Sequence, residues 1–378
     1  MKIYFLVVCI FLTACSKREV NEQIDLISEP IIKTETILTG YEIIWGMDLL
    51  PNGDLVFGEK RGKLFLKKAT EIVEITGLPS INSAGQGGLL DIRVHPNFNS
   101  NGWIYCTYSG FLIGGGGANW NLARFNIIDK KVSNWQILLT TESPNTWNGH
   151  FGSRIEFDDQ GYVYATVGEG GTGSYGGVNA TNMNAQNVKS VWGKVHRLTE
   201  SGSIPNDNPV LTGNIRATSV FTYGHRNPQG LAFNNITKEL WETEHGPKGG
   251  DEINILKKGT NYGWPLVSFG TNYDGVVISS NPLRADVETP IHYWTPSIAP
   301  SGMAFITSNS FKKWKGNLLC GSLAFSYLVR CELNNGKVAK EYKMLENIGR
   351  VRNIKQAPDG SIYVSIEGPG RIIQIKAE

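Results

Sequence analysis

The stretch RIEFDDQGYVYATVGE, residues 154–169, decides the fold of this chain. A short apolar strand leads into a polar turn that ends in glycine, and a strand of alternating β-branched and aromatic residues follows, which is typical of an antiparallel hairpin. The same unit recurs five times, as MDLLPNGDLVFGEKRGKLFL (47–66), LDIRVHPNFNSNGWIYCTYS (90–109), LAFNNITKELWETEHG (231–246), MAFITSNSFKKWKGNLLCGSL (303–323) and IKQAPDGSIYVSIEGPGRIIQI (354–375).

The spacing of these copies predicts the architecture. Their second strands begin near Leu55, Trp103, Tyr162, Leu240, Asn317 and Ile362, so one copy occupies on average about 61 residues. A propeller blade of four strands has this length, and six copies predict an all-β, six-bladed β-propeller over residues 39–378. The 44 glycines and 14 tyrosines agree with many tight turns and strands. Long loops interrupt the unit, and binding residues are expected there.

Charge excludes one class of partner. Lys and Arg number 36 against 34 Asp and Glu, and no basic run follows a phosphate backbone, so nucleic acid is not an expected partner. The sequence contains no GxGxxG unit between a strand and a helix, so NAD is not an expected cofactor.

The first residues indicate export. Lys2, the apolar IYFLVVCIFL and the small residues before Cys15 resemble a bacterial lipoprotein signal, in which that cysteine is lipidated. We therefore expect a signal peptide at 1–14, a polar tether at 15–38, and a chain anchored only by its lipid to a bacterial membrane, facing the periplasm or the cell surface. The mature chain then keeps Cys106, Cys320 and Cys331, and whether Cys320 and Cys331 form a disulfide stays open.

Three loops carry candidate site residues. SAGQGGLLDI offers Gln86 on a turn between glycines, and NTWNGHFGSRIEF offers His150, followed 19 residues later by Glu169, a carboxylate able to orient a histidine base. YGHRNPQG supplies Arg226 and Asn227, and EHGPKGGDEIN supplies carbonyl oxygens and Glu252 for a hard cation such as calcium. Each residue could instead serve only a turn or an ion pair, and His225 and His245 are alternative reactive histidines.

From Gly40 to Lys376 the chain resembles the soluble pyrroloquinoline quinone (PQQ)-dependent aldose sugar and glucose dehydrogenases. The resemblance rests on GQGGLLDI, HFGSRIEF, YGHRNPQG, EHGPKGGDEIN, NYGWP and GRVRNI. It implies oxidation of an aldose at its anomeric carbon to the lactone, with PQQ and Ca²⁺ as cofactors. It also implies a role for each matching residue: His150 as the base, Glu169 as its orienting group, Arg226 in charge stabilisation, and Gln86, Asn227, Arg226, Arg350 and Arg352 at the quinone.

The resemblance implies two calcium sites as well. Gly246 and Pro247 match carbonyl ligands of the calcium beside PQQ, and Glu252 and Tyr262 match a second, structural calcium site. One position departs from the pattern: Ala324 stands where the family has a lysine after GSL, which predicts weaker PQQ binding.

Two other functions stay open. A calcium-dependent sugar lactonase would place a cage of carboxylates and asparagines around a metal in the channel, and a surface-tethered propeller could bind a ligand without chemistry. The sequence leaves the preferred sugar, the electron acceptor and the oligomeric state undetermined.

Overall fold

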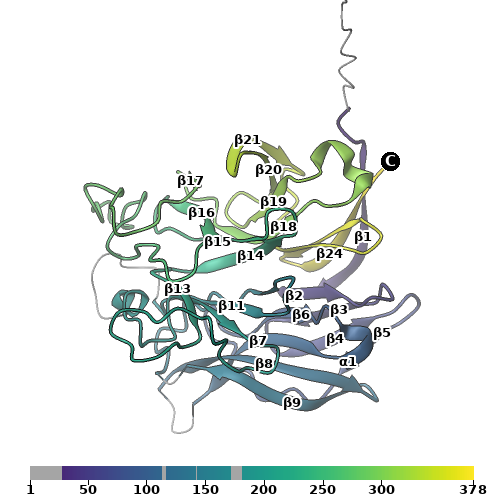
Figure 1. Ribbon diagram of the computed structural model, residues 1–378. Helices are drawn as coiled ribbons and strands as arrows, with labels where there is room; N and C mark the ends of the chain where they lie inside the picture. Colours follow the sequence, from purple (N-terminus) through teal and green to yellow (C-terminus); the bar gives the residue numbers. More distant parts are fainter. Residues whose placement is uncertain (1–27, 113–115, 142, 172–180) are drawn as a thin grey trace, which may run out of the picture.

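The computed structural model describes residues 28–112, 116–141, 143–171 and 181–378. Within them lie six antiparallel sheets of four strands each. The first strands of successive sheets contact one another in a closed ring, β2 to β6, β10, β14, β18, β22 and back to β2. This confirms the predicted six-bladed propeller, whose sheets surround a common centre (Figure 1).

The first three sheets follow chain order. The first holds β2 (Ile44–Leu49), β3 (Leu55–Glu59), β4 (Lys63–Lys67) and β5 (Ile72–Ile75). The second holds β6 (Leu89–Val94), β7 (Ile104–Phe111), β8 (Ala118–Ile128) and β9 (Lys131–Thr140), with α1 (Phe98–Asn101) between its first two strands. The third holds β10 (Ile155–Phe157), β11 (Val163–Val167), β12 (Lys194–Leu198) and β13 (Val220–Tyr223), with the 3-10 turn η1 (Asn182–Ala185) before β12.

The last three sheets include the closure. The fourth holds β14 (Pro228–Asn234), β15 (Glu239–Glu244), β16 (Asp251–Leu256) and β17 (His292–Trp294). The fifth holds β18 (Pro300–Phe305), β19 (Leu318–Ser322), β20 (Leu328–Asn334) and β21 (Lys337–Met344), with η2 (Asn309–Trp314) before β19. The sixth holds β22 (Arg350–Gln356), β23 (Ile362–Glu367), β24 (Gly370–Ala377) and, at its edge, β1 (Ile32–Tyr41).

The hairpin unit read from the sequence is the inner half of each blade. The second strands β3, β7, β11, β15, β19 and β23 each begin within one residue of the predicted position. In the quoted stretch, Ile155 pairs with Ala165 and Phe157 with Val163, as the alternation predicts.

The N-terminal strand β1 closes the ring, and it begins before the expected boundary between the tether and the propeller. β1 pairs along β24 from Ile32 opposite Ala377 to Tyr41 opposite Gly370. Residues 32–38, assigned above to the tether, therefore belong to the sixth sheet, because the last blade lacks a fourth strand of its own. Cys15 and the expected signal peptide lie outside the described residues.

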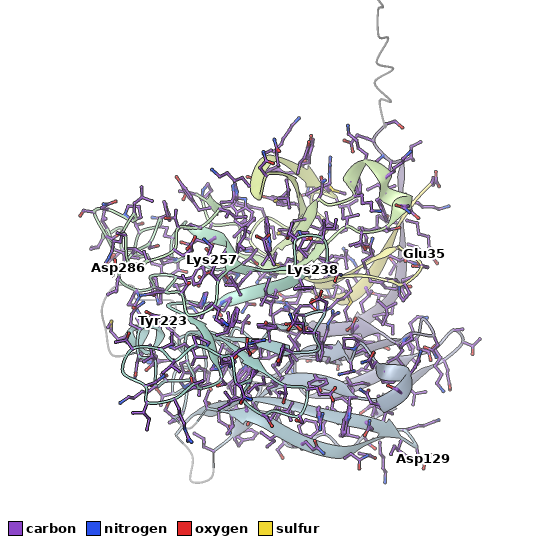
Figure 2. The ribbon with its side chains drawn as sticks, in the orientation of Figure 1. Glu35, Asp129, Tyr223, Lys238, Lys257 and Asp286 are labelled. Atoms are coloured by element: carbon purple, nitrogen blue, oxygen red, sulfur yellow. The ribbon has the colours of Figure 1, made fainter. Side chains whose placement is uncertain are left out.

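The core lies between neighbouring sheets, and solvated charge lies outside it. Trp120, Phe151 and Trp192 are buried where the second sheet meets the third. By contrast, Glu35, Asp129 and Asp286 are exposed at the outside of the molecule (Figure 2). Among the described residues no helix is long and apolar enough to cross a membrane.

The three described cysteines are free thiols. Cys320 on β19 and Cys331 on β20 are both fully buried, and they lie diagonally across the strand pair, since Cys320 pairs with Val329 and Cys331 with Leu318. A hydrogen bond with Cys320, together with burial, raises the pKa of the Cys331 thiol.

Candidate active site

One end of the central channel opens into a cavity of about 270 Å³, which we call the central pocket. Its lining comes from the beginnings of the innermost strands and the loops before them, including Trp45, Leu90, Gln229 and Arg352. A different hollow at the opposite channel mouth is lined by the ends of the same strands, including Leu49 and Phe305. The pocket therefore collects loops from all six blades.

His150 and Glu169 form a buried pair behind the lining of this pocket, to which Phe151, the next residue in the chain, belongs. His150 Nδ1 lies 2.7 Å from Glu169 Oε1, and only 4% and 1% of the two residues are exposed. The His150 backbone N–H donates to Gln86 Oε1 at 3.1 Å, and Gln86 lines the pocket. Burial, with Arg226 nearby, lowers the pKa of His150 although Glu169 opposes the shift. A neutral imidazole donating Nδ1–H to Glu169 keeps the lone pair of Nε2 for a substrate proton.

The loop around His150 is tightly constrained. The backbone of His150 has φ 38°, in the left-handed region that side chains other than glycine rarely adopt. Its carbonyl packs against Gly168, where a Cβ would come within 2.1 Å of that oxygen. Only glycine at 168 leaves room for this loop, which explains the glycine before Glu169 in the VGEGG segment. Unusual backbone geometry of this kind is common at functional sites.

Three cations and one carboxylate form one wall of the pocket. Glu367 accepts from Arg350 Nε at 2.9 Å and from Arg352 Nε at 2.6 Å. Burial works to raise the pKa of Glu367, but Arg352 and Arg350 outweigh it and hold the pKa below its usual value. Lys60, the third cation, donates to the Ser83 carbonyl at 2.8 Å. The wall carries net positive charge and suits an anionic ligand.

Arg226 and Asn227 leave the same turn in different directions. Asn227 lines the central pocket, and its Oδ1 accepts from the Gly152 N–H at 3.1 Å. Arg226 donates through Nη1 to the carbonyls of His245 and Gly246, at 3.0 and 2.8 Å. The Arg226 carbonyl accepts from the Glu169 N–H at 2.9 Å, which ties this turn to the histidine pair.

A buried ion pair forms the floor beneath the pocket. Arg154 Nη1 lies 3.0 Å from Asp91 Oδ1, with 2% and 0% of the side chains exposed. Arg154 also donates to the carbonyls of Gln229 and Arg352, at 2.9 and 3.1 Å, and its guanidinium lies over the Trp45 ring. The floor therefore fixes two residues that line the pocket.

The expected calcium residues fall into two neighbouring pockets. Gly246, Glu252 and Tyr262 line a small pocket together with Arg226 and Glu244, which we call the Glu252 pocket. Pro247 lines the next hollow, together with Ala324. The turn is fixed by Asp251, which accepts from the Gly246 N–H at 2.9 Å. Burial raises the pKa of Asp251 to about 6 although its hydrogen bonds oppose the shift.

The two alternative histidines have other commitments. His245 lines the central pocket, but its Nε2 is 2.7 Å from the Pro300 carbonyl, and burial with Arg226 lowers its pKa to about 3. His225 is fully buried among carboxylates and does not line the central pocket. Of the three histidines, His150 combines a buried carboxylate partner, Glu169, with direct neighbours in the pocket lining, Phe151 in the chain and Gln86 through a hydrogen bond.

Five residues of the site and of the ion pair beneath it were not predicted from the sequence: Lys60, Asp91, Arg154, Gln229 and Glu367. Gln229 and Arg154 stand inside the motifs YGHRNPQG and HFGSRIEF, so their place in a motif was an available signal. Glu367 is the last residue of β23 and Lys60 directly follows β3, both at the pocket end of a second strand, which is a signal that only the propeller topology supplies.

The sequence of this chain is similar to those of known proteins. The sequence model of the family described as Glucose / Sorbosone dehydrogenase matches residues 41–374. The chain belongs to this family. It is 34% identical to Aldose sugar dehydrogenase YliI of Escherichia coli (strain K12) over 339 residues, which cover 88% of this chain and 89% of that protein.

Two solved structures of this kind share the fold. The apo crystal structure of the soluble aldose sugar dehydrogenase from Escherichia coli superposes with a TM-score of 0.85 at 32% identity, covering 92% of this chain and 100% of that one. The PQQ-bound form of the aldose sugar dehydrogenase from Streptomyces coelicolor superposes with a TM-score of 0.73 at 25% identity, covering 93% and 100%. The dehydrogenase resemblance read from the motifs is therefore confirmed at the level of the family and the fold.

Proposed function

We propose that this chain oxidises aldose sugars at the anomeric carbon to the lactone, using PQQ as the cofactor, Ca²⁺ as the activating cation and His150 as the base. The observation that carries the proposal is the buried His150–Glu169 pair beside a pocket lined by cations. A PQQ-bound relative and a relative named aldose sugar dehydrogenase support the choice of cofactor and substrate class.

The residues of the central pocket fit PQQ, which is a flat molecule with three carboxylates. Lys60, Arg350 and Arg352 would hold carboxylates, since arginine and lysine form strong charge-assisted hydrogen bonds with them. Trp45 and Phe151 supply apolar surface in the same pocket. Arg226 lines the neighbouring Glu252 pocket, and in the described part of the chain its buried Nε has no hydrogen-bond partner.

The calcium beside PQQ would be held by the carbonyl oxygens of Gly246 and Pro247. These are oxygen donors of the kind that Ca²⁺ prefers, and the turn that presents them is held by Asp251. Arg226 donates to the Gly246 carbonyl, so this guanidinium would share that oxygen with the cation.

When bound, PQQ supplies the hydride acceptor, and a cation at its oxygens makes it a stronger one. His150 does the proton chemistry of the chain itself. Glu169 accepts from Nδ1, so Nε2 takes the proton of the sugar's C1 hydroxyl while hydride leaves the same carbon. Gln86 fixes the backbone of His150, and Arg226 places positive charge near the reacting oxygens.

Absorbance spectroscopy tests the proposal against a lactonase and a binding propeller. We expect purified protein with PQQ and Ca²⁺ to bleach a redox dye when an aldose is added, and to do nothing with NAD in place of PQQ. Hydrolysis of a sugar lactone without dye reduction would indicate the lactonase. Binding of sugar without either reaction would indicate the propeller without chemistry.

We also propose that the protein is exported and anchored through a lipid on Cys15. The support is the signal-like composition of residues 1–15. Glu29, inside the expected tether, accepts from Trp314 Nε1 and pairs with Arg330 at 3.3 Å, and β1 then starts at the channel end opposite the central pocket. The lipid anchor on Cys15 is the part of the proposal that an experiment must test. Fractionation of cells that express wild type and Cys15→Ser tests this, with a soluble wild type refuting it.

A further inference from the structure

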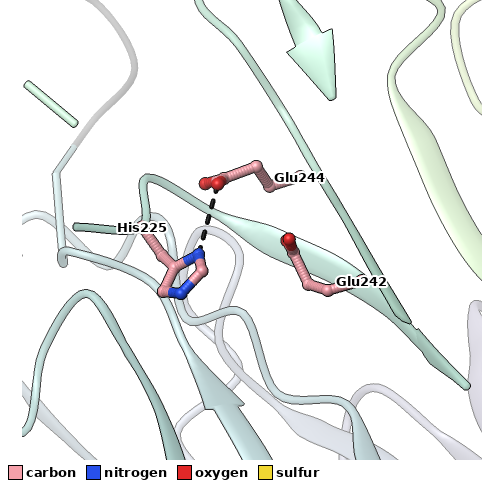
Figure 3. A group of neighbouring side chains, drawn as sticks. All are labelled: His225, Glu242 and Glu244. Carbon is pink, nitrogen blue, oxygen red and sulfur yellow. Dashed lines mark hydrogen bonds and ion pairs between the residues drawn. The ribbon is translucent and has the colours of Figure 1, made fainter. Parts of the chain in front are cut away.

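A second group of ionisable side chains lies behind the turn that carries Arg226 and Asn227. His225 comes from this turn, and Glu242 and Glu244 project from β15 (Figure 3). One candidate ligand atom from each of the three lies within 4.8 Å of the others, and all three residues are buried. We call this group the His225 cluster.

Negative charge in the cluster is not balanced by any cationic side chain. Glu242 and Glu244 are 0% and 4% exposed, and neither forms an ion pair with a lysine or arginine among the described residues. Asn254 Nδ2 contacts both, at 3.2 and 3.5 Å, and also Glu252 Oε2 at 3.2 Å. Buried carboxylates this close need a proton or a cation between them.

Two oxygens of the cluster have no partner in the described structure. They are Glu242 Oε1 and Asn254 Oδ1, and both residues are 0% exposed. A buried acceptor left unpaired costs about 1–3 kcal/mol, so native structures rarely leave one without a reason. Both oxygens belong to side chains that already meet at the Asn254 amide, which is the arrangement expected around a missing positive ligand.

His225 is held so that one of its ring nitrogens can bind the same ion as the oxygens of Glu242 and Asn254. His225 Nε2 lies 2.8 Å from Thr222 Oγ1, and Nδ1 lies 3.2 Å from Glu244 Oε1. The Thr222 hydroxyl can accept, so an Nε2–H donated to it leaves the Nδ1 lone pair toward the carboxylates. The Tyr262 ring stacks on the imidazole at 4.8 Å and fixes its plane. Partners of this kind orient metal-ligating histidines.

We propose that the His225 cluster binds one divalent transition-metal ion, through His225 Nδ1, Glu242 and Glu244, with Asn254 Oδ1 as a further oxygen ligand. One imidazole and several carboxylate or amide oxygens suit Mn²⁺ or Zn²⁺, whereas Ca²⁺ takes oxygen ligands. The site lies beside the calcium position expected at Glu252 and Tyr262: Glu244 lines the Glu252 pocket as well, whereas Glu242 does not.

The ion would support the active-site turn from behind. The backbone N–H of Arg226 donates to Glu244 Oε2 at 2.6 Å, and His225 precedes Arg226 in the chain. An ion that joins Glu244 to His225 therefore fixes both ends of the contact that positions Arg226. This role does not depend on the reaction proposed above, so the test can fail while the dehydrogenase assignment stands.

The test loads metal-stripped protein with Mn²⁺ in the presence of excess Ca²⁺. We expect about one Mn²⁺ per chain after gel filtration, and pulsed electron paramagnetic resonance should detect coupling to a histidine nitrogen, a measurement that needs no variant. Glu242→Gln is nearly isosteric and should weaken Mn²⁺ binding by at least about 10- to 100-fold. Glu239→Gln, on the same strand but outside the His225 cluster, is the matched control, and it should keep the Mn²⁺.

The melting temperature shows whether Glu242→Gln is folded. Without metal this variant should melt no lower than wild type, since it removes a repelling charge, and Mn²⁺ should raise the melting temperature of wild type only. Three results would each overturn the proposal: no stoichiometric Mn²⁺ or Zn²⁺ in wild type, bound Mn²⁺ without nitrogen coupling, or equal affinity in Glu242→Gln. Protons shared among the carboxylates would then hold the cluster together.

Discussion

His150 is held in the position of a base by contacts with its side chain and with its backbone. Glu169 accepts from Nδ1, Gln86 accepts from the backbone N–H, and the left-handed backbone is fixed against Gly168. Such a residue has little freedom to leave its position, which is what proton transfer in a short-lived transition state requires. The functional interpretation of this histidine therefore depends on its contacts more than on its residue type.

Replacement of His150 by alanine should lower turnover by about 10²- to 10⁴-fold, the usual contribution of a positioned general base. The affinity for PQQ should change little, because the cationic wall holds the carboxylates. Glu169→Gln should have a smaller effect on turnover. Steady-state kinetics and a PQQ titration measure both quantities. Near-normal turnover in His150→Ala, with activity lost in His245→Ala, would show that His245 is the base and that His150 is not.

The acid limb of the pH profile should lie below pH 6.5. Burial and Arg226 lower the pKa of His150 from its ordinary value, and Glu169 opposes this. The neutral imidazole is the active form, so kcat/KM is full above this pKa and is lost as the pH falls through it. Glu169→Gln removes the group that raises the pKa and should move the limb to still lower pH. A limb that moves upward in this variant would contradict the assignment.

Lys60 should provide the lysine contact that Ala324 cannot make. Ala324 lines the hollow beside Pro247, whereas Lys60 lines the central pocket and uses only one of its three donors, on Ser83. Lys60→Met should weaken PQQ binding by roughly 10- to 150-fold, the equivalent of one charge-assisted hydrogen bond of about 1.5 to 3 kcal/mol. PQQ titrations at fixed Ca²⁺ measure this change.

The same titration on Ala324→Lys tests the expectation that alanine at this position weakens PQQ binding. Partial recovery of affinity in the Lys60→Met background would show that both positions reach the same anion. If Lys60→Met binds PQQ as tightly as wild type, the arginines alone hold the cofactor and Lys60 has only a structural contact with Ser83.

At the scale of the elements, β1 joins the first sheet to the last. Leu38 is buried in a cluster with Met47, Phe57 and Ile372, so it touches strands from both ends of the chain. This contact and the pairing with β24 close the ring. A propeller with an open ring would expose an unpaired edge strand.

Leu38→Ala should therefore lower the free energy of unfolding by about 2–5 kcal/mol, as expected for a large-to-small change in a core. Thr36→Ala on the same strand is the control, since Thr36 is exposed, and it should have almost no effect. Urea unfolding of the two variants measures the difference. Equal stability of both would mean that β1 is dispensable for closure.

The elements also explain what the sequence could and could not predict. The inner hairpins were predictable, because Ile155, Phe157 and Val163 alternate with the pleat and their turns carry glycine. β1 was not, because Ile32–Tyr41 is mostly exposed and its pairing with β24 joins residues more than 300 positions apart. The motifs located His150 and Arg226, but Asn254 and Glu252 come opposite Glu242 and Glu244 only when β15 and β16 pair.

At the scale of the whole molecule, the channel is closed by charge rather than by apolar side chains. Arg154 joins the third blade to Asp91 of the second, to Gln229 of the fourth and to Arg352 of the sixth. Asp91 also accepts from the Ile155 N–H at 2.9 Å. One guanidinium thus ties four blades together beneath the pocket.

Removal of Arg154 should affect stability and the site together. Arg154→Met leaves Asp91 as an unpaired buried carboxylate, which should lower the free energy of unfolding by about 3–5 kcal/mol. The double variant Asp91→Asn/Arg154→Met should recover much of this loss, since neither charge then remains buried. Arg284→Met is the control, because Arg284 pairs with Asp286 on the surface and its loss should not be measurable.

PQQ affinity shows whether the Arg154–Asp91 ion pair positions the central pocket or only stabilises the fold. Arg154 fixes the carbonyls of Gln229 and Arg352, and both residues line the central pocket, so the double variant should bind PQQ more weakly than wild type even where its stability has recovered. Urea unfolding and a PQQ titration on the same samples separate the two effects. Full PQQ affinity in the recovered double variant would mean that the pocket is positioned by the blades themselves, and that the ion pair only fills the channel.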